Sequence, residues 1–491
     1  MSALSNARWL ILIQAYKIIL QLLSMGILAR LLPPSDYGLI AMAWTATNFA
    51  TLLRDLGTTS AIIQKNELTE QIKSTIFWMQ MALGLFLCII LIAFSGVIAK
   101  AFNELKLQTI LSLLAITFPL GGISAVHQAM LERESSFRVL ARIEIVASSS
   151  GLFVAIISAY LGAGVYSFVW QSFVITLLYV IQSTLAYTWR PLMVWDRQAI
   201  RQIFGYSSNL SAYTFISFFT RNADSLIIGR YLGATALGTY SMAYKLMLFP
   251  LQNLTTVANR ALFPVMSRQQ DSNSELASLY VRVVAMVAAI STPMMAGLFI
   301  LREPFTKMVF GGQWGDVAHI IVWLAPVGAL QSIVNTTVTV YTAKGRTDIL
   351  FRTGLLSAII TVCAFFGGLS RGVVGVALFY CFANMLIFVP QTYFACRLIS
   401  LPYRTFLRGL APPLICTAIM SPVVFYGYQN LLFLGDIPAS VISTGIGALS
   451  YFICYLVFFR EGMLKLLQVV LGNKLSRLHR ANRIAPGSPK I

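Results

Sequence analysis

The segment Arg221–Tyr244 reads RNADSLIIGRYLGATALGTYSMAY and lies in the middle of a long apolar region. It carries Arg221, Asn222 and Asp224 within a single helical turn. Ionisable groups at membrane depth are costly, so each of them is a functional candidate. We therefore expect this segment to carry charges on which the function of the protein depends.

The second part of this segment repeats an earlier stretch of the chain. Residues 29–43 read ARLLPPSDYGLIAMA, and residues 229–243 read GRYLGATALGTYSMA. The matched pairs, at an offset of 200 positions, are Arg30 with Arg230, Leu32 with Leu232, Gly38 with Gly238, and Met42 and Ala43 with Met242 and Ala243. The sequence therefore predicts an internal duplication.

The composition indicates a membrane protein. Of the 491 residues, 57% are hydrophobic and 11% are charged, whereas an ordinary globular protein has about 25% charged residues. The first apolar run, residues 9–28, lacks a signal-peptide cleavage pattern, so we interpret it as a retained helix. The three histidines and six cysteines are scattered and show no ligand spacing. We expect no disulfide framework, metal site or cofactor.

Runs of mostly apolar residues with the length of a membrane helix, about 20 residues, predict about fourteen spans. They are 8–29, 37–53, 76–99, 107–130, 139–161, 163–187, 207–229, 236–259, 279–301, 317–342, 349–369, 372–396, 409–429 and 439–459. The offset of the repeat covers six spans, an even number, so both copies cross the membrane in the same direction. We predict an all-α polytopic membrane protein with two parallel six-helix repeats and two additional C-terminal helices.

The predicted parts are an N-lobe (1–195), a C-lobe (196–400), the last two spans (401–460) and a basic cytoplasmic tail (461–491). Most of the 36 lysines and arginines fall in every second loop. Because cytoplasmic loops retain positive charge, we expect both termini in the cytoplasm. The net charge of +19 is then a sign of topology rather than of a nucleic-acid partner.

Arg221 and Asp224 share one face of their predicted helix. They can form an ion pair that merely tolerates burial. Alternatively, Arg221 presents its planar guanidinium to a phosphate, while Asp224 orients it or takes up a cation.

Polar side chains recur at helical spacing on several other predicted spans, as Asn48 and Thr51 do on the span 37–53. The candidates for substrate binding in a central cavity are Lys17, Arg221, Lys245, Asn48, Gln331 and Asn335, and the candidates for a coupling ion are Asp224 and Glu144. Such stripes also serve as contacts between helices, and Glu144 has a plainer interpretation as the partner of Arg138 or Arg142. If Arg221 and Asp224 neutralise each other, Lys17 and Lys245 favour an anionic substrate over a cationic drug.

The sequence does not favour an enzyme. It lacks the motifs G-x-x-x-x-G-K-[ST], H-E-x-x-H and G-x-S-x-G. The predicted external loops are too short for a catalytic domain. We therefore predict a transporter driven by an ion gradient, by the membrane potential or by removal of its product.

Residues 222–244 match N-x-D followed by I-I-G-R-x-L-G-x-x-A-L-G-x-Y-S-x-A-Y. This motif resembles the signature of Wzx-type polysaccharide flippases of the multidrug/oligosaccharidyl-lipid/polysaccharide (MOP) exporter superfamily, which also contains the MATE transporters. Further pieces agree in order, namely residues 29–43, RDLGTTSAIIQ at 54–64, ALFPVMSR at 261–268 and VFGGQW at 309–314. The resemblance covers roughly residues 5–460 and is to the colanic-acid and exopolysaccharide exporter branch.

The resemblance implies a bacterial inner-membrane flippase that moves undecaprenyl-diphosphate-linked oligosaccharide units to the periplasmic leaflet. It implies alternating access between two lobes and a role in exopolysaccharide or O-antigen (lipopolysaccharide) biosynthesis. It also implies contact with membrane lipids, a polysaccharide polymerase and a chain-length regulator. Lys17, Arg221 and Lys245 correspond by role to the basic cavity residues of the family. The alternatives are a drug/cation antiporter of the same superfamily, a membrane glycan polymerase or ligase, and a non-transporting scaffold.

Overall fold

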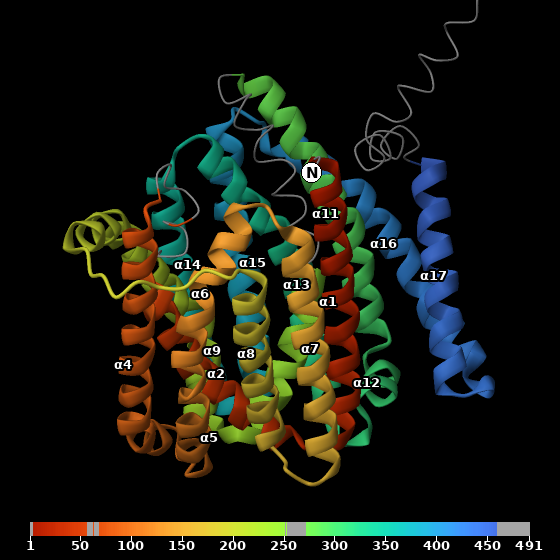
Figure 1. The fold of residues 1–491 in the computed structure, drawn as a ribbon. Coiled ribbons are helices and arrows are strands. Elements are labelled where there is room, and N and C mark those ends of the chain that lie inside the picture. The colour runs from red at the N-terminus through yellow and green to blue at the C-terminus, as the bar shows by residue number, and fades with distance from the viewer. Residues whose placement is uncertain (1–2, 56–61, 63–67, 251, 253–271, 459–491) are drawn as a thin grey trace, which may run out of the picture. The chain divides into compact units, whose positions relative to one another are not determined.

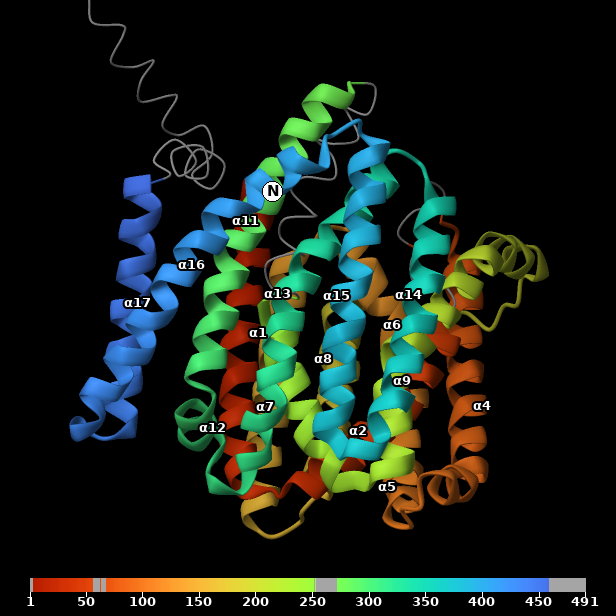
Figure 2. The same cartoon turned by 180° about the vertical axis from the view of Figure 1, so that it is seen from behind.

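The structure of the protein, a computed structural model, describes residues 3–55, 62, 68–250, 252 and 272–458. Within these ranges the regular secondary structure is entirely helical, which confirms the all-α prediction. The helices are shown in Figures 1 and 2. They are α1 (Ala3–Leu31), α2 (Pro34–Asp55), α4 (Glu70–Phe102), α5 (Lys106–Ala115), α6 (Thr117–Arg133), α7 (Phe137–Tyr160), α8 (Tyr166–Ala186), α9 (Arg197–Pro250), α11 (Asn273–Ile300), α12 (Arg302–Phe310), α13 (Gly315–Ala343), α14 (Thr347–Gly368), α15 (Gly372–Leu398), α16 (Tyr403–Leu431) and α17 (Asp436–Phe458).

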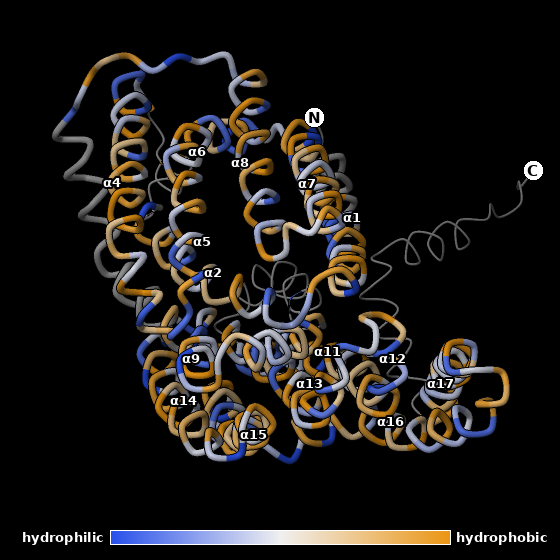
Figure 3. Tube along the Cα trace, turned by 90° about the horizontal axis from the view of Figure 1, so that it is seen from below, coloured by the Kyte–Doolittle hydropathy of each residue, from blue (hydrophilic) through white to orange (hydrophobic). Residues whose placement is uncertain are grey.

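Nine helical stretches in the described part of the chain are long and apolar enough to cross a membrane. Figure 3 shows hydrophobic residues along all of the labelled helices, with hydrophilic residues interspersed among them. The prediction of a multi-pass membrane protein is confirmed. The count of fourteen spans stays a prediction.

The two copies of the repeated segment interrupt their helices at matched positions. Pro33 lies between α1 and α2, because proline has no amide hydrogen to continue the first helix. The matched residue, Gly233, is the non-helical point inside α9, with φ 83° and ψ −180°. Glycine adopts a positive φ without the steric cost that other residues carry. The predicted spans 207–229 and 236–259 therefore appear as one helix with a sharp kink.

The contacts divide the chain into two compact units. Unit 1 comprises Met1–Met242, Val309–Val317 and Phe365–Val376, and unit 2 comprises the remaining segments, Ala243–Met308, Ala318–Ala364 and Ala377–Ile491. The first six predicted spans all belong to unit 1, together with two short segments from the second half of the chain. The predicted lobes, 1–195 and 196–400, stay a prediction.

In unit 1, the start of α2 packs against the second part of α9 through a reciprocal pair of contacts. Gly38 lies so close to Ala234 that an added Cβ would overlap the Ala234 carbonyl oxygen. Gly238 stands in the same relation to the carbonyl oxygen of Pro34. The repeat matches position 34 with 234 and position 38 with 238, so the contact has the symmetry of an isologous interface. Only glycine allows the two backbones to approach so closely.

A segment from the second half of the chain packs on the same region of unit 1. Trp314 Nε1 donates to the Ala29 carbonyl oxygen at 2.7 Å, and Gln313 Nε2 donates to the same oxygen at 2.6 Å. The Trp314 ring is fully buried and meets Tyr37 edge to face, with 5.0 Å between the ring centroids. Tyr37 in turn meets Phe168 of α8, also at 5.0 Å. Hydrogen bonds and aromatic packing thus hold this end of unit 1 together.

Unit 2 has a hydrophobic core of its own, which joins α11, α13, α15 and α16. Tyr280 of α11 and Phe406 of α16 are fully buried and stacked, with 6.0 Å between the ring centroids. Tyr341 of α13 donates to the backbone carbonyl of Gln391 in α15 at 2.9 Å. Burial of large aromatic side chains provides much of the stabilisation of such a core.

Candidate functional site

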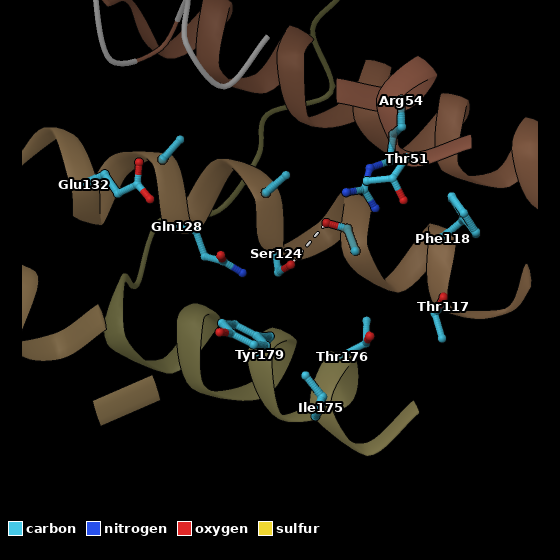
Figure 4. Close-up of a pocket in the computed structure, with 13 residues that line it drawn as sticks. Thr51, Arg54, Thr117, Phe118, Ser124, Gln128, Glu132, Ile175, Thr176 and Tyr179 are labelled. Carbon is cyan, nitrogen blue, oxygen red and sulfur yellow. Dashed lines mark hydrogen bonds between the residues drawn. The ribbon is translucent and has the colours of Figure 1, made fainter. Parts of the chain in front are cut away.

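A cavity of about 410 Å³ lies between α2, α6 and α8 in unit 1. Figure 4 shows side chains from all three helices around it. The lining side chains with polar or charged groups are Thr51, Arg54, Thr117, Ser124, Gln128, Glu132, Thr176 and Tyr179. Two of the walls, α6 and α8, belong to helical stretches long and apolar enough to span a membrane. Polar cavities at such a depth are typical of substrate pathways.

The hydroxyl groups of the cavity wall already donate to their own helices. Thr51 and Thr176 each donate to the backbone carbonyl four residues earlier, at 2.9 Å and 2.8 Å. Ser124 donates to the Gly121 carbonyl at 3.1 Å, drawn as the dashed line in Figure 4. A hydroxyl has one hydrogen and two lone pairs. These side chains therefore offer acceptors to a ligand.

Arg54 brings a positive charge to the cavity from α2. Its guanidinium lies against Gly121 of α6, where an added Cβ would overlap Nη1. The absence of a side chain at position 121 thus makes room for the guanidinium. Glu132, which is exposed, adds a carboxylate to the lining. The two formal charges of the lining balance each other.

Tyr179 connects the cavity wall to an ion pair in the same unit. Its hydroxyl donates to Glu144 Oε2, and Lys17 Nζ lies 3.1 Å from the same oxygen. Ser148 donates to the other carboxylate oxygen, Oε1, at 3.2 Å. The side chains of Lys17 and Glu144 are 45% and 23% exposed, so the pair is only partly buried. The network fixes the position of the ammonium group.

The expected pairing of Glu144 with Arg138 or Arg142 is wrong. Among the ion pairs of the described residues, Lys17 supplies the cation for Glu144. The reason is tertiary, since α1 and α7 pack together and the Tyr16 hydroxyl hydrogen-bonds to Ser149 of α7. The ammonium of Lys17 is thus balanced by a carboxylate, and the argument that Lys17 adds an uncompensated positive charge does not hold.

Arg221 and Asp224 do not form an ion pair with each other in this structure, where both residues are described. Asp224 is 4% exposed, and its Oδ1 accepts from the Ser225 backbone amide at 2.6 Å. Arg221 is exposed. The first interpretation, a self-satisfied pair, is therefore not the arrangement observed.

The other predicted candidates differ in their surroundings. Asn48 is exposed on α2, and Lys245 and Asn335 are half-buried. Gln331 of α13 donates to the Tyr380 hydroxyl at 2.6 Å and to Asn384 Oδ1 at 3.0 Å, both on α15. The structure thus gives Gln331 a role in helix packing. Lys17, Asn48, Glu144, Arg221 and Asp224 belong to unit 1, and Lys245, Gln331 and Asn335 belong to unit 2.

Sequence reasoning missed most of the cavity. It singled out Thr51 on α2 but none of the polar residues on α6 and α8. Ser124, Gln128 and Glu132 recur every four residues and so share one helix face, which was an available signal. No group of three or more His, Cys, Asp or Glu residues in the described ranges is placed to hold a metal ion.

The chain belongs to the polysaccharide biosynthesis protein family, whose sequence profile matches residues 27–319. It is similar to the succinoglycan biosynthesis transport protein ExoT of Rhizobium meliloti (strain 1021), with 27% identity over 96% of each chain. It is also similar to the teichuronic acid biosynthesis protein TuaB of Bacillus subtilis (strain 168), with 25% identity over 86% of this chain and 88% of that protein. The lipopolysaccharide biosynthesis protein WzxC of Escherichia coli (strain K12) is 25% identical over 84% of each.

The fold resembles those of solved transporter structures. The lipid II flippase MurJ in an inward closed conformation superimposes with a TM-score of 0.73, over 94% of this chain and 99% of MurJ, at 16% identity. An inward-facing multidrug resistance transporter of the MATE family gives a TM-score of 0.61 over 78% of this chain and 94% of that one, at 15% identity. The predicted resemblance to polysaccharide biosynthesis proteins is confirmed.

Proposed function

We propose that the protein is a flippase that moves undecaprenyl-diphosphate-linked oligosaccharide units from the cytoplasmic to the periplasmic leaflet of a bacterial inner membrane. The observation that carries this proposal is a polar cavity between apolar helices, in a chain of the polysaccharide biosynthesis family. The substrate has a charged head and an extended glycan. Both need a polar route through the membrane, because their transfer into hydrocarbon is strongly unfavourable.

The diphosphate requires cationic partners, and three residues are proposed for it. Arg221 is exposed and has the planar guanidinium that suits phosphate. Lys17 is held in place by Glu144 and remains partly exposed. Lys245 is the candidate from unit 2. In the proposed cycle, the ammonium of Lys17 leaves the Glu144 carboxylate and pairs with the diphosphate.

The sugars are the proposed ligands of the neutral polar candidates. Asn48 and Asn335 carry amide groups that can both donate to and accept from sugar hydroxyls. Gln331 has the same chemistry, although its hydrogen bonds to α15 must open before it can bind a sugar. Asn48 is exposed, so its amide is the most accessible of the three to a sugar.

The membrane potential is sufficient to drive the proposed movement. A negative charge that moves outward across an inside-negative membrane runs downhill by about 2.3 kcal/mol per 100 mV. A coupling ion is therefore optional on energetic grounds. Asp224 and Glu144 are the proposed carriers if a proton or sodium ion is exchanged. Flipping measured in liposomes at several pH values and sodium concentrations tests this: a rate that responds to neither removes both residues from that role.

The remaining parts of the proposal concern topology and partners. Both termini are cytoplasmic, which follows from the distribution of lysine and arginine over the predicted loops. Lobes 1–195 and 196–400 alternate in access, followed by spans within 401–460 and a basic cytoplasmic tail at 461–491. A polysaccharide polymerase and a chain-length regulator are the expected partners for product removal.

A deletion strain tests the proposed function. We expect lipid-linked repeat units to accumulate on the cytoplasmic leaflet, and the purified chain in proteoliposomes to restore their transfer. Uptake of a cationic drug, assayed in the same vesicles, serves as the control for the antiporter alternative. If repeat units reach the periplasm in the deletion strain without a substitute flippase, the proposal is wrong.

A further inference from the structure

We propose that the cavity between α2, α6 and α8 is a glycan subsite, which binds a hydroxyl-rich sugar ring of the substrate and not its diphosphate. This inference rests on the proposed flippase function and deepens it. It assigns recognition of the sugar to α2, α6 and α8 of unit 1. The candidates for the diphosphate then have a separate task.

The charge of the cavity lining suits a sugar better than it suits a diphosphate or a cationic drug. A diphosphate would require several cationic groups around it, and a cationic drug would require an excess of carboxylates. The lining contains one of each, Arg54 and Glu132. A balanced pair of opposite charges among hydroxyl and amide groups suits a ligand with many hydroxyls and little net charge.

The hydrogen-bonding groups match such a ligand. The hydroxyls of Thr51, Ser124 and Thr176 donate to backbone carbonyls, so their lone pairs are left as acceptors for sugar hydroxyls. The Gln128 side chain reaches into the cavity from α6 (Figure 4), and it makes no hydrogen bond to any other described residue. An amide can donate and accept at once. Together they provide the mixed pattern that a sugar ring requires.

The size and the apolar part of the wall also fit. A volume of about 410 Å³ lies at the lower end of the range of about 300–1,000 Å³ for small-molecule sites. Phe118 lines the cavity beside the polar groups, and Ala125 and Ile175 add small apolar surfaces. A sugar ring presents C–H groups on its faces, and aromatic and aliphatic side chains cover such surfaces.

The wall residue Tyr179 links this subsite to Lys17. Its hydroxyl is bound to Glu144 Oε2, the oxygen that also holds Lys17. If the Tyr179 hydroxyl donates to a sugar hydroxyl, it no longer donates to Glu144. The Glu144 carboxylate, with one donor fewer, then binds Lys17 more strongly. Occupancy of the glycan subsite thus sets how readily Lys17 is released to the diphosphate.

The test compares two probes on the purified full chain in nanodiscs. One probe is the soluble oligosaccharide released by mild acid from the lipid-linked units of a deletion strain, and the other is undecaprenyl diphosphate without sugars. Ala125→Leu fills the cavity, and Ala93→Leu adds the same side chain at an exposed position of α4. We expect Ala125→Leu to weaken oligosaccharide binding roughly tenfold or more and to change undecaprenyl diphosphate binding by less than about twofold. Ala93→Leu should leave both affinities unchanged.

The outcomes distinguish failure of the proposed glycan subsite from failure of the proposed flippase function. If the wild-type chain binds no soluble oligosaccharide, or if Ala125→Leu binds it as tightly as wild type, the subsite is overturned. Gln128→Leu gives a second measurement with little change in volume, and it should also weaken the oligosaccharide selectively. Failure of wild-type proteoliposomes to flip the lipid-linked units would instead overturn the proposed function.

Discussion

The two copies of the repeated segment are alike where they touch each other and unlike just before that point. Gly38 and Gly238 form matched halves of one contact. Seventeen and fourteen residues earlier, the first copy has Gln21 and Ser24, whereas the second has Arg221 and Asp224. The contact constrains both copies equally, because each backbone occupies the space that a Cβ of the other would need. No such reciprocal constraint acts on the polar positions, so one copy could acquire charges.

The burial of the positions where the two copies differ, 21 with 221 and 24 with 224, agrees with the presence of charges in only one copy. Gln21 and Arg221 are both exposed, while Ser24 is half-buried and Asp224 is buried. A buried carboxylate is costly unless it is hydrogen-bonded, and Asp224 has the Ser225 amide as a donor. The architecture is therefore shared between the copies, and the chemistry belongs to one of them.

The largest effect is expected from breaking the shared contact. Gly38→Val and Gly238→Val should each destabilise the protein by about 1–3 kcal/mol or more, because the added atoms overlap a backbone carbonyl that cannot move aside. Thermal unfolding in detergent measures the loss. Gly297→Val is the matched control, since nothing lies within 4 Å of a Cβ at that helical position. If one glycine tolerates valine and the other does not, the contact is not reciprocal.

The second effect concerns the charges that only one copy carries. Arg221→Ala should lower flipping at least about tenfold while the protein remains inserted, because the exposed guanidinium is a proposed phosphate ligand. Gln21→Ala, at the matched position of the first copy, should retain nearly full activity. Adding Asp224→Ala should not rescue Arg221→Ala. Normal transport by the double variant would make both residues structural.

A smaller effect is expected at the ion pair of α1 and α7. Glu144→Gln removes the carboxylate that positions Lys17, so the affinity for undecaprenyl diphosphate should change severalfold, by about 0.5–1 kcal/mol. Lys17→Met should abolish that sensitivity in the combined variant. A double-mutant cycle on the affinity measures the coupling between the two positions. Additive effects would show that the pair does not act as a unit.

A further effect, on stability rather than on affinity, is expected at the hydrogen bonds that hold the segment around Trp314. Trp314→Phe keeps an aromatic ring, smaller than the indole, and removes the donor to the Ala29 carbonyl, which still accepts from Gln313. The loss should therefore be about 0.5–1.5 kcal/mol, seen as a small drop in melting temperature. A loss as large as that at Gly38 would mean that packing of the ring, and not the donor, was disturbed.

Sequence patterns predicted much of the architecture because hydrophobic runs and a repeat are local properties. They placed Arg221 and Asp224 on one helix face, but they could not show that the carboxylate accepts from the backbone instead of pairing with the arginine. They assigned Glu144 to an arginine nearby in sequence, whereas its partner, Lys17, comes from another helix. Which polar stripes meet depends on helix rotation and packing, and these are fixed by the whole unit.

The dependence on helix packing also explains why the cavity was not predicted. Thr51 was identified on a polar stripe of α2, but its neighbours across the cavity, Gln128 and Tyr179, lie on two other helices. The room for Arg54 depends on a glycine, Gly121, whose importance appears only when α2 and α6 are placed together. Spacing alone could have indicated a polar face on α6 but not what it faces.

The reciprocal contact of Gly38 and Gly238 also bears on the ancestry of the chain. An isologous contact is what two identical subunits make across a two-fold axis. When such subunits are joined into one polypeptide, the axis remains as a pair of matched contacts between the former partners. The contact from Pro34 to Gly38 therefore keeps the symmetry that two identical subunits joined into one polypeptide would have.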